Sequence, residues 1–187
     1  MAVTDNFNRA DSTSLGANWT VHQGGLEIVT NEAKAVVNGI TVERYNAASF
    51  ANDQYSQTKH TGGTLIEGAA VRCDLADTGD SYVGFGATLD FFTIARYDNN
   101  SKTDLAFTAE FATNNAILKL TVTGTSLELL QDGVSKVTTT DATYASGAAG
   151  IVTLATGATL DDWEGGDIGA AAAGFRIRRR RLLGIGA

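Results

Sequence analysis

The stretch AILKLTVTGTSLELLQDGVSKVTTT, residues 116–140, decides the fold class of this sequence. Apolar and polar residues alternate over 118–122, and successive side chains of a β-strand point to opposite faces, so this segment predicts a strand with one apolar face. Gly124 marks a turn. The dipeptide Asp132-Gly133 is favoured in two-residue hairpin turns, because both central positions need a positive φ. The stretch therefore predicts a meander of three antiparallel strands.

Alternation with a period of two recurs along the rest of the chain, and no convincing helical spacing is sustained over three turns. The chain has 21 glycines and no proline, a composition that favours strands joined by glycine turns. Further strands are expected at 18–22, 26–29, 33–38, 48–58, 66–74, 81–88, 91–97, 104–111, 149–155 and 158–164. So many short strands do not fit in one open sheet, and we expect an all-β, two-sheet antiparallel sandwich of the jelly-roll type.

The charged residues divide the chain into an acidic body and a basic end. The whole sequence contains 14 Lys+Arg and 21 Asp+Glu. Five of the arginines follow the last acidic residue, which leaves 9 basic against 21 acidic residues, a net charge of −12, for the body. We expect a β-sandwich domain over 1–164, a Gly/Ala-rich linker over 165–174 and an extended basic and apolar C-terminal arm over 175–187.

The sequence lacks the usual signals of a membrane-spanning or secreted chain. Leu, Ile, Val and Phe occur only in short runs, whereas a membrane helix needs roughly 18 or more consecutive apolar residues. The N-terminal MAVTDNFNRAD lacks the basic and then apolar layout of a secretory signal. The single cysteine, Cys73, cannot form an internal disulfide, and it alternates with Arg72 and Asp74 as a buried strand residue would.

Two terminal motifs and the central meander resemble one family of β-sandwich modules. The first motif is DNFNRADSTSLGANWTV at 5–21, and the second is SGAAGIVTLATGATLDDWEGGD at 146–167, with LTVTGTSLELLQDG between them. In this order they resemble the laminin G-like or concanavalin A-like jelly-roll modules, especially those of bacteriophage structural proteins and bacterial proteins. The resemblance covers residues 3–167 and implies a fold that hosts lectins, glycanases and passive structural modules.

The same resemblance implies an arrangement of the termini. In this family the first and last strands usually pair, which would bring Phe7, Trp19 and Trp163 into one core. The family also allows a calcium ion near the termini, with its ligands drawn from Asp5, Asp161 and Asp162. We favour a solvated acidic rim for these aspartates, and we expect neither a metal nor another cofactor.

The sequence contains no recognisable catalytic set. A retaining glucanase of this fold carries a Glu-x-Asp-x-x-Glu strand that places two carboxylates about 5 Å apart, and no such motif occurs here. His22 and His60 have no cysteine or second histidine at a metal-binding spacing, and no serine lies in a Gly-x-Ser-x-Gly elbow. We therefore predict that the protein is not an enzyme, and a degenerate glycanase is the least favoured alternative.

A carbohydrate-binding face is suggested by DSYVGFGATLDFFTIARYDNN, residues 80–100. Tyr82, Gly84 and Gly86 share one face of the expected strand, and the glycines would leave room beside the ring for a sugar. Tyr97 and the polar residues after it would add a rim. The alternative is that the glycines relieve crowding where a curved sheet bends and that the tyrosines pack half-buried.

The C-terminal arm combines arginines with apolar residues, namely Phe175, Arg176, Ile177, Arg178, Arg179, Arg180, Arg181, Leu182, Leu183 and Ile185. Guanidinium groups form forked bonds with carboxylates, so we expect the arm to fasten to an acidic surface of a neighbouring subunit, including another copy of this chain. A solvated tail is the alternative. We expect no nucleic-acid binding, because the run is short and the acidic body repels a polyanion, and no membrane anchor, because the apolar part is too short.

These features lead to two hypotheses for the function. The first is a non-enzymatic virion structural protein, a phage capsid decoration or cement protein that stabilises the shell from the capsid surface after assembly in the host cytoplasm. Its partners would be the major capsid protein or other virion subunits, and it would form a homo-oligomer, with a trimer favoured. The second is a carbohydrate-binding, lectin-like module of a tail fibre or surface protein.

Overall fold

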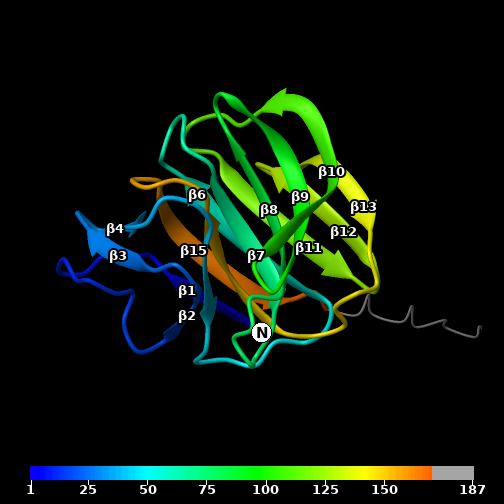
Figure 1. Cartoon of the computed structure of the whole chain (residues 1–187), viewed down its shortest axis with the longest axis horizontal. Helices are drawn as coiled ribbons and strands as arrows, with labels where there is room; N and C mark the ends of the chain where they lie inside the picture. The colour runs from blue at the N-terminus through cyan, green and yellow to red at the C-terminus, as the bar shows by residue number, and fades with distance from the viewer. Residues whose placement is uncertain (170–187) are drawn as a thin grey trace, which may run out of the picture.

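A computed structural model describes residues 1–169 of the chain, which form two antiparallel β-sheets packed face to face (Figure 1). The eight-stranded sheet has the order β13 (Val134–Thr140), β12 (Ser126–Gln131), β11 (Ile117–Thr123), β6 (Gln54–His60), β15 (Thr159–Asp167), β4 (Glu32–Ala35) and β3 (Leu26–Val29), with β1 (Ala2–Asp5) beside β15. The seven-stranded sheet has the order β10 (Ser101–Phe111), β9 (Asp90–Asp98), β8 (Ser81–Ala87), β7 (Glu67–Cys73), β14 (Ala148–Thr153), β5 (Thr41–Tyr45) and β2 (Trp19–Gln23). The expectation of an all-β, two-sheet sandwich is therefore confirmed.

The predicted meander is present as β11, β12 and β13. Leu120 of β11 stands opposite Leu129 of β12, and both side chains are fully buried between the sheets. The two turns have the backbone that the sequence required, with positive φ at Gly124 and at both Asp132 and Gly133. The described part of the chain has no helix of the length and apolarity that crossing a membrane requires.

Two clusters of buried side chains fill the space between the sheets, and a third lies on the other face of the seven-stranded sheet. The first two clusters draw residues from both sheets. All the buried members of the third belong to the seven-stranded sheet and include Val83, Phe85 and Tyr97. Because these residues alternate along β8 and β9 with members of the second cluster, they point away from the partner sheet.

The chain termini meet as the family resemblance implied. β1 pairs with β15, and Phe7, Trp19 and Trp163 lie in one buried cluster. The ring centroids of Trp19 and Trp163 are 4.7 Å apart, and those of Phe7 and Trp19 are 5.8 Å apart. The expected domain limit at residue 164 is too early, because β15 continues to Asp167 and its two glycines pair with β1 and β6.

The sequence missed two strands and misplaced a third. The local sequence patterns predicted neither β1 nor β5, and the strand expected at 48–58 begins only at Gln54. The segment before it is therefore a loop, which lies at the same end of the sandwich as the end of β7. β5 escaped notice because TVERY places two charged residues in the middle of a short strand, and Glu43 is nevertheless buried at 2% exposure.

Glu43 should make stability depend on pH. Burial raises the pKa of this carboxyl to about 7 from its ordinary 4.5, although its oxygen accepts the Leu26 N–H at 2.7 Å, which lowers the pKa. A raised pKa means that ionisation is costlier in the folded state, so stability is full below the ordinary pKa and falls as the pH rises through the folded value.

Glu43→Gln keeps an acceptor for Leu26 and removes the ionisation. We expect the variant to gain up to about 3 kcal/mol over the parent at pH 8 and nearly nothing at pH 4.5. Urea unfolding at both pH values measures this difference, and an equal effect at the two pH values would contradict the assignment.

Candidate functional site

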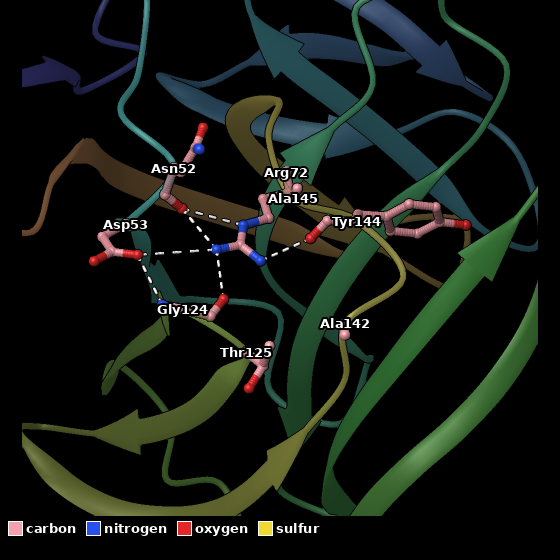
Figure 2. Close-up of a pocket in the computed structure, with 8 residues that line it drawn as sticks. All are labelled: Asn52, Asp53, Arg72, Gly124, Thr125, Ala142, Tyr144 and Ala145. Atoms are coloured by element: carbon pink, nitrogen blue, oxygen red, sulfur yellow. Dashed lines mark hydrogen bonds and ion pairs between the residues drawn. The ribbon is translucent and has the colours of Figure 1, made fainter.

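A cavity of about 270 Å³ lies where three loops meet at one end of the sandwich. Figure 2 shows the residues that line it, which we call the Arg72 pocket: Asn52, Asp53, Arg72, Gly124, Thr125, Ala142, Tyr144 and Ala145. They come from the loop before β6, the end of β7, the β11–β12 turn and the segment after β13. Both sheets therefore contribute to the wall.

Arg72 connects these segments from inside the protein. Its guanidinium donates from Nε and Nη2 to the Asn52 carbonyl, at 3.1 and 2.9 Å, and from Nη1 to the Tyr144 carbonyl at 2.7 Å (Figure 2). Nη2 also donates to the Gly124 carbonyl at 2.7 Å. Only 3% of Arg72 is exposed, and this burial lowers the pKa of the guanidinium, while Tyr82 and Asp53 oppose the shift. One buried cation thus holds three loops in fixed positions.

A bulge in β7 aims Arg72 at the loops. Cys73 pairs with Ala148 and Ala70 pairs with Gly150, so two residues of β7 face one of β14 at this point. Arg72 has a φ of 50°, in the left-handed region that non-glycine residues seldom adopt. β-Bulges of this kind re-aim a side chain. The sequence pattern placed Arg72 on an exposed face beside a buried Cys73, whereas the bulge buries both residues.

Asp53 supplies the exposed charge of the pocket. Its Oδ1 accepts the Gly124 N–H at 2.7 Å and lies 4.0 Å from Nη2 of Arg72, while 43% of its side chain is exposed. Within residues 1–169, the hydrogen bonds of Asp53 and Asn52 use Oδ1 and the backbone carbonyl, which leaves Oδ2 of Asp53, the side-chain amide of Asn52 and the hydroxyl of Thr125 without a protein partner. The residues that line the pocket therefore carry a carboxylate oxygen, an amide and a hydroxyl that no hydrogen bond within the described chain uses.

A polar network behind the pocket fixes the segment that carries Tyr144. The buried Tyr82 hydroxyl donates to Asp141 at 2.6 Å and accepts the Tyr144 N–H at 3.0 Å. Nη1 of Arg96 also contacts Asp141, at 2.8 Å. Burial acts to raise the pKa of Asp141, but hydrogen bonds from Thr143 and Tyr82 outweigh it and lower the pKa to about 2. Asp141 therefore remains ionised and able to hold this wall at ordinary pH.

Tyr82→Phe should loosen this wall without changing the shape of the core. The variant leaves the Tyr144 N–H without its acceptor, and we expect a loss of about 1–2 kcal/mol in unfolding free energy. We also expect faster hydrogen exchange at the Tyr144 amide, measured by NMR. Unchanged exchange at that amide would show that Tyr82 does not hold the segment.

A larger cavity of about 350 Å³ is lined by residues of the segments 44–50 and 146–148, which adjoin in sequence the segments 52–53 and 142–145 that line the Arg72 pocket. Its wall includes the apolar side chains of Tyr45, Phe50 and Leu75. Its one guanidinium, that of Arg44, is bound to Asp77 through two hydrogen bonds of 2.7 and 3.1 Å. The hydroxyls of Ser49 and Ser146 also line this cavity, but its guanidinium binds one carboxylate and does not join several loops as that of Arg72 does.

The predicted Tyr82–Tyr97 glycan face does not form. Tyr82 is fully buried between the sheets, whereas Tyr97 lies on the opposite face of the seven-stranded sheet with 4% exposure. The space beside Gly84 is filled, because a Cβ there would lie 2.9 Å from Cδ1 of Leu129. Gly84 makes room for the partner sheet, and Gly86 makes room for Phe92 of β9, so neither glycine leaves space for a sugar. Tyr82 instead acts from behind the Arg72 pocket.

The aspartates considered for calcium have other neighbours. Asp5 accepts hydrogen bonds from Arg9 and from Nε1 of Trp19, at 2.6 and 2.8 Å. Asp5 and Asp162 both line a cavity of about 270 Å³ at the terminal strands, whereas Asp161 does not. Among residues 1–169 no three His, Cys, Asp or Glu side chains are grouped so that they could hold a metal ion.

Both histidines lie in strands and contact carboxylates that the sequence pattern did not reveal. Nδ1 of His60 lies 2.7 Å from Glu67, with both side chains fully buried, and burial raises the pKa of Glu67. Nε2 of His22 lies 2.9 Å from Asp74. The predicted partner-binding arm, 175–187, falls outside the described residues, as do residues 170–174 of the expected linker.

Solved structures share this architecture. The carbohydrate-binding module CBM66 from Bacillus subtilis matches with a TM-score of 0.65 and 16% identity, over 81% of this chain and 95% of that one. A β-1,3-1,4-glucanase (lichenase) from a mouse hindgut metagenome matches with a TM-score of 0.59 and 11% identity, over 89% of this chain and 98% of that one. The exoplasmic/lumenal domain of VIP36, in a Ca²⁺/Man3GlcNAc-bound form, matches with a TM-score of 0.55 and 13% identity, over 82% of this chain and 85% of that one.

This chain has a concanavalin A-like jelly-roll fold. No family model and no curated protein matches the sequence. The identities of 11–16% mean that the likeness is one of fold. The three jelly rolls named above are a carbohydrate-binding module, a glucanase and a glycan-bound lumenal domain, and none is described as a virion protein.

Proposed function

We propose that this protein is a non-catalytic carbohydrate-binding protein and that the Arg72 pocket is its binding site. The observation that carries the proposal is the buried Arg72 itself, which fixes three loops around a cavity of about 270 Å³ that Asn52, Asp53 and Thr125 help to line. Preorganised polar groups around a small cavity suit a ligand that is rich in hydroxyl groups. Carbohydrate binding therefore replaces the virion hypothesis as the favoured function.

The chemistry of the pocket favours binding over hydrolysis. Glycoside hydrolysis ordinarily needs two carboxyl groups, about 5 Å apart in retaining enzymes and about 6.5–9.5 Å apart in inverting ones. Asp53 is the one carboxylate among the residues that line the described pocket. A single carboxylate can accept sugar hydroxyls but cannot supply both the acid and the base or nucleophile.

A glycan array probed with the full chain tests the proposed function. We expect a defined group of saccharides to bind, with isothermal titration calorimetry confirming a one-to-one complex on the soluble saccharide. The calorimetry sample also reports hydrolysis, since the saccharide can be recovered intact at the end. Absence of binding across the array would overturn the proposed function, and release of free sugar would overturn its non-catalytic part.

A further inference from the structure

Four apolar side chains form an exposed patch on the seven-stranded sheet, which we call the phenylalanine patch: Leu89, Phe91, Phe107 and Phe111. Their exposed fractions are 74%, 39%, 68% and 49%. The ring of Phe91 lies 5.4 Å from that of Phe111 and 6.4 Å from that of Phe107, centroid to centroid. Clustered exposed aromatics on a soluble domain mark an interaction site.

The position of the patch separates it from the Arg72 pocket. Phe111 pairs with Phe91, and Phe107 pairs with Thr93, so the rings lie at the start of β9 and the end of β10, the edge strand at the right of the sheet in Figure 1. Asp90 pairs with Ala87 at the same end, whereas Arg72 lies at the opposite end of the sheet. The proposed saccharide site does not use this surface.

The chemistry of the C-terminal arm complements this patch. Phe175, Ile177, Leu182 and Leu183 offer apolar side chains, and the arginines among them can stack on exposed aromatic rings through cation–π contacts. Carboxylates lie near the patch at Asp90 and Asp104, and Asp104 is 52% exposed although it contacts Lys102, whereas Glu110 faces the other sheet and binds Lys136 of β13. The body carries −12 and the arm +5, so the long-range attraction has the right sign.

The length of the chain favours the patch of a second copy. The described chain ends at Gly169, close to the Arg72 end of β7. Asp167 pairs with Gln54, and the side chain of Gln54 accepts a hydrogen bond from the backbone N–H of Arg72. The patch lies at the other end of β7 and three strands away, about 25 Å across the sheet and on its outer face. The six residues from Gly169 to Phe175 span at most about 20 Å. Phe175 therefore falls short of its own patch, so an arm that places this phenylalanine on a patch comes from a second copy, whereas residues from about Ile177 onward are within reach of the patch of their own copy.

We propose that the phenylalanine patch of one copy binds the C-terminal arm, 175–187, of a second copy. Each copy then gives its arm to a neighbour and receives an arm in turn, which closes into a symmetric oligomer when the rotation between copies permits. This self-association is independent of saccharide binding at the Arg72 pocket.

Sedimentation velocity on the full chain over a range of concentrations tests this proposal. We expect the parent protein to associate. The patch variant carries Phe107→Ser and Phe111→Ser, and the arm variant carries Arg178→Ser, Arg179→Ser, Arg180→Ser and Arg181→Ser. We expect each variant to associate at least about tenfold more weakly than the parent. Val134→Ser is the matched control, because Val134 is 60% exposed on the other edge strand, β13. All these side chains except the arm's are exposed on a described strand, so circular dichroism can verify the unchanged fold.

Mixing the patch variant with the arm variant, each of which is defective in association, gives the decisive result. One variant retains an arm and the other retains a patch, so we expect the mixture to form complexes that neither variant forms alone. A parent that stays monomeric at every concentration, a patch variant that associates like the parent, or a mixture that stays monomeric would each overturn the proposal.

Discussion

Replacing Arg72 with alanine is expected to lower the unfolding free energy by about 3–4 kcal/mol. The reason is that the carbonyls of Asn52, Gly124 and Tyr144 would lose a buried, charged donor, and a buried acceptor without a partner costs about 1 kcal/mol or more. The midpoint of urea unfolding measures this effect, with the slope of the transition showing that both proteins unfold to the same extent.

Two comparisons make the Arg72 result specific. Arg72→Lys keeps the charge but cannot donate to three carbonyls in a fixed fork, so it should recover only part of the loss. Lys102→Ala, which removes a cation that contacts the exposed Asp104 at 2.7 Å, should change stability by less than about 1 kcal/mol. Equal effects of Arg72→Ala and Lys102→Ala would show that the buried guanidinium does not hold the loops.

Removing the Asp53 carboxylate should have the largest effect on binding. Asp53 carries the one carboxylate among the residues that line the described pocket, and a hydrogen bond to a charged group contributes about 1.5–3 kcal/mol. We therefore expect Asp53→Ala to weaken saccharide binding about 10- to 100-fold in calorimetric titrations. Asp53→Asn keeps an acceptor for the Gly124 N–H, and its expected loss is smaller.

Asp11→Ala is the matched control for Asp53. Oδ1 of Asp11 accepts the Thr30 N–H at 2.9 Å, as Oδ1 of Asp53 accepts that of Gly124, but Asp11 lies outside the Arg72 pocket. Asp11→Ala should destabilise its own loop about as much as Asp53→Ala destabilises the loop before β6, and it should leave the affinity for the saccharide unchanged. If Asp11→Ala and Asp53→Ala weakened binding equally, the loss would reflect general loop loosening and the pocket assignment would fail.

The sequence predicted the sandwich well because its strands carry local signals. Alternation over 118–122 and the Asp132-Gly133 turn both act over a few residues, and the packed sheets use them as expected. The pairing of the termini, by contrast, joins residues more than 150 positions apart, as in Asp5 with Trp163. Only the family resemblance indicated that contact, since no local pattern specifies it.

The candidate site could not be predicted in the same way. Its residues come from four separate segments, and Arg72 joins them only because a bulge turns its side chain inward. An arginine in the apolar run AAVRC was the available signal, but simple alternation placed it on an exposed face. Tyr82 drew attention for its neighbouring glycines, yet the space beside Gly84 is filled by Leu129 of the opposite sheet, which no short-range pattern reveals.

NMR titration of the ¹⁵N-labelled full chain with an array-selected saccharide tests the central claim most directly. We expect the largest amide shifts on residues 52–53, 124–125 and 142–145, the three loop segments held by Arg72. Saturating shifts confined to β9 and β10, with these loop amides unmoved, would contradict it.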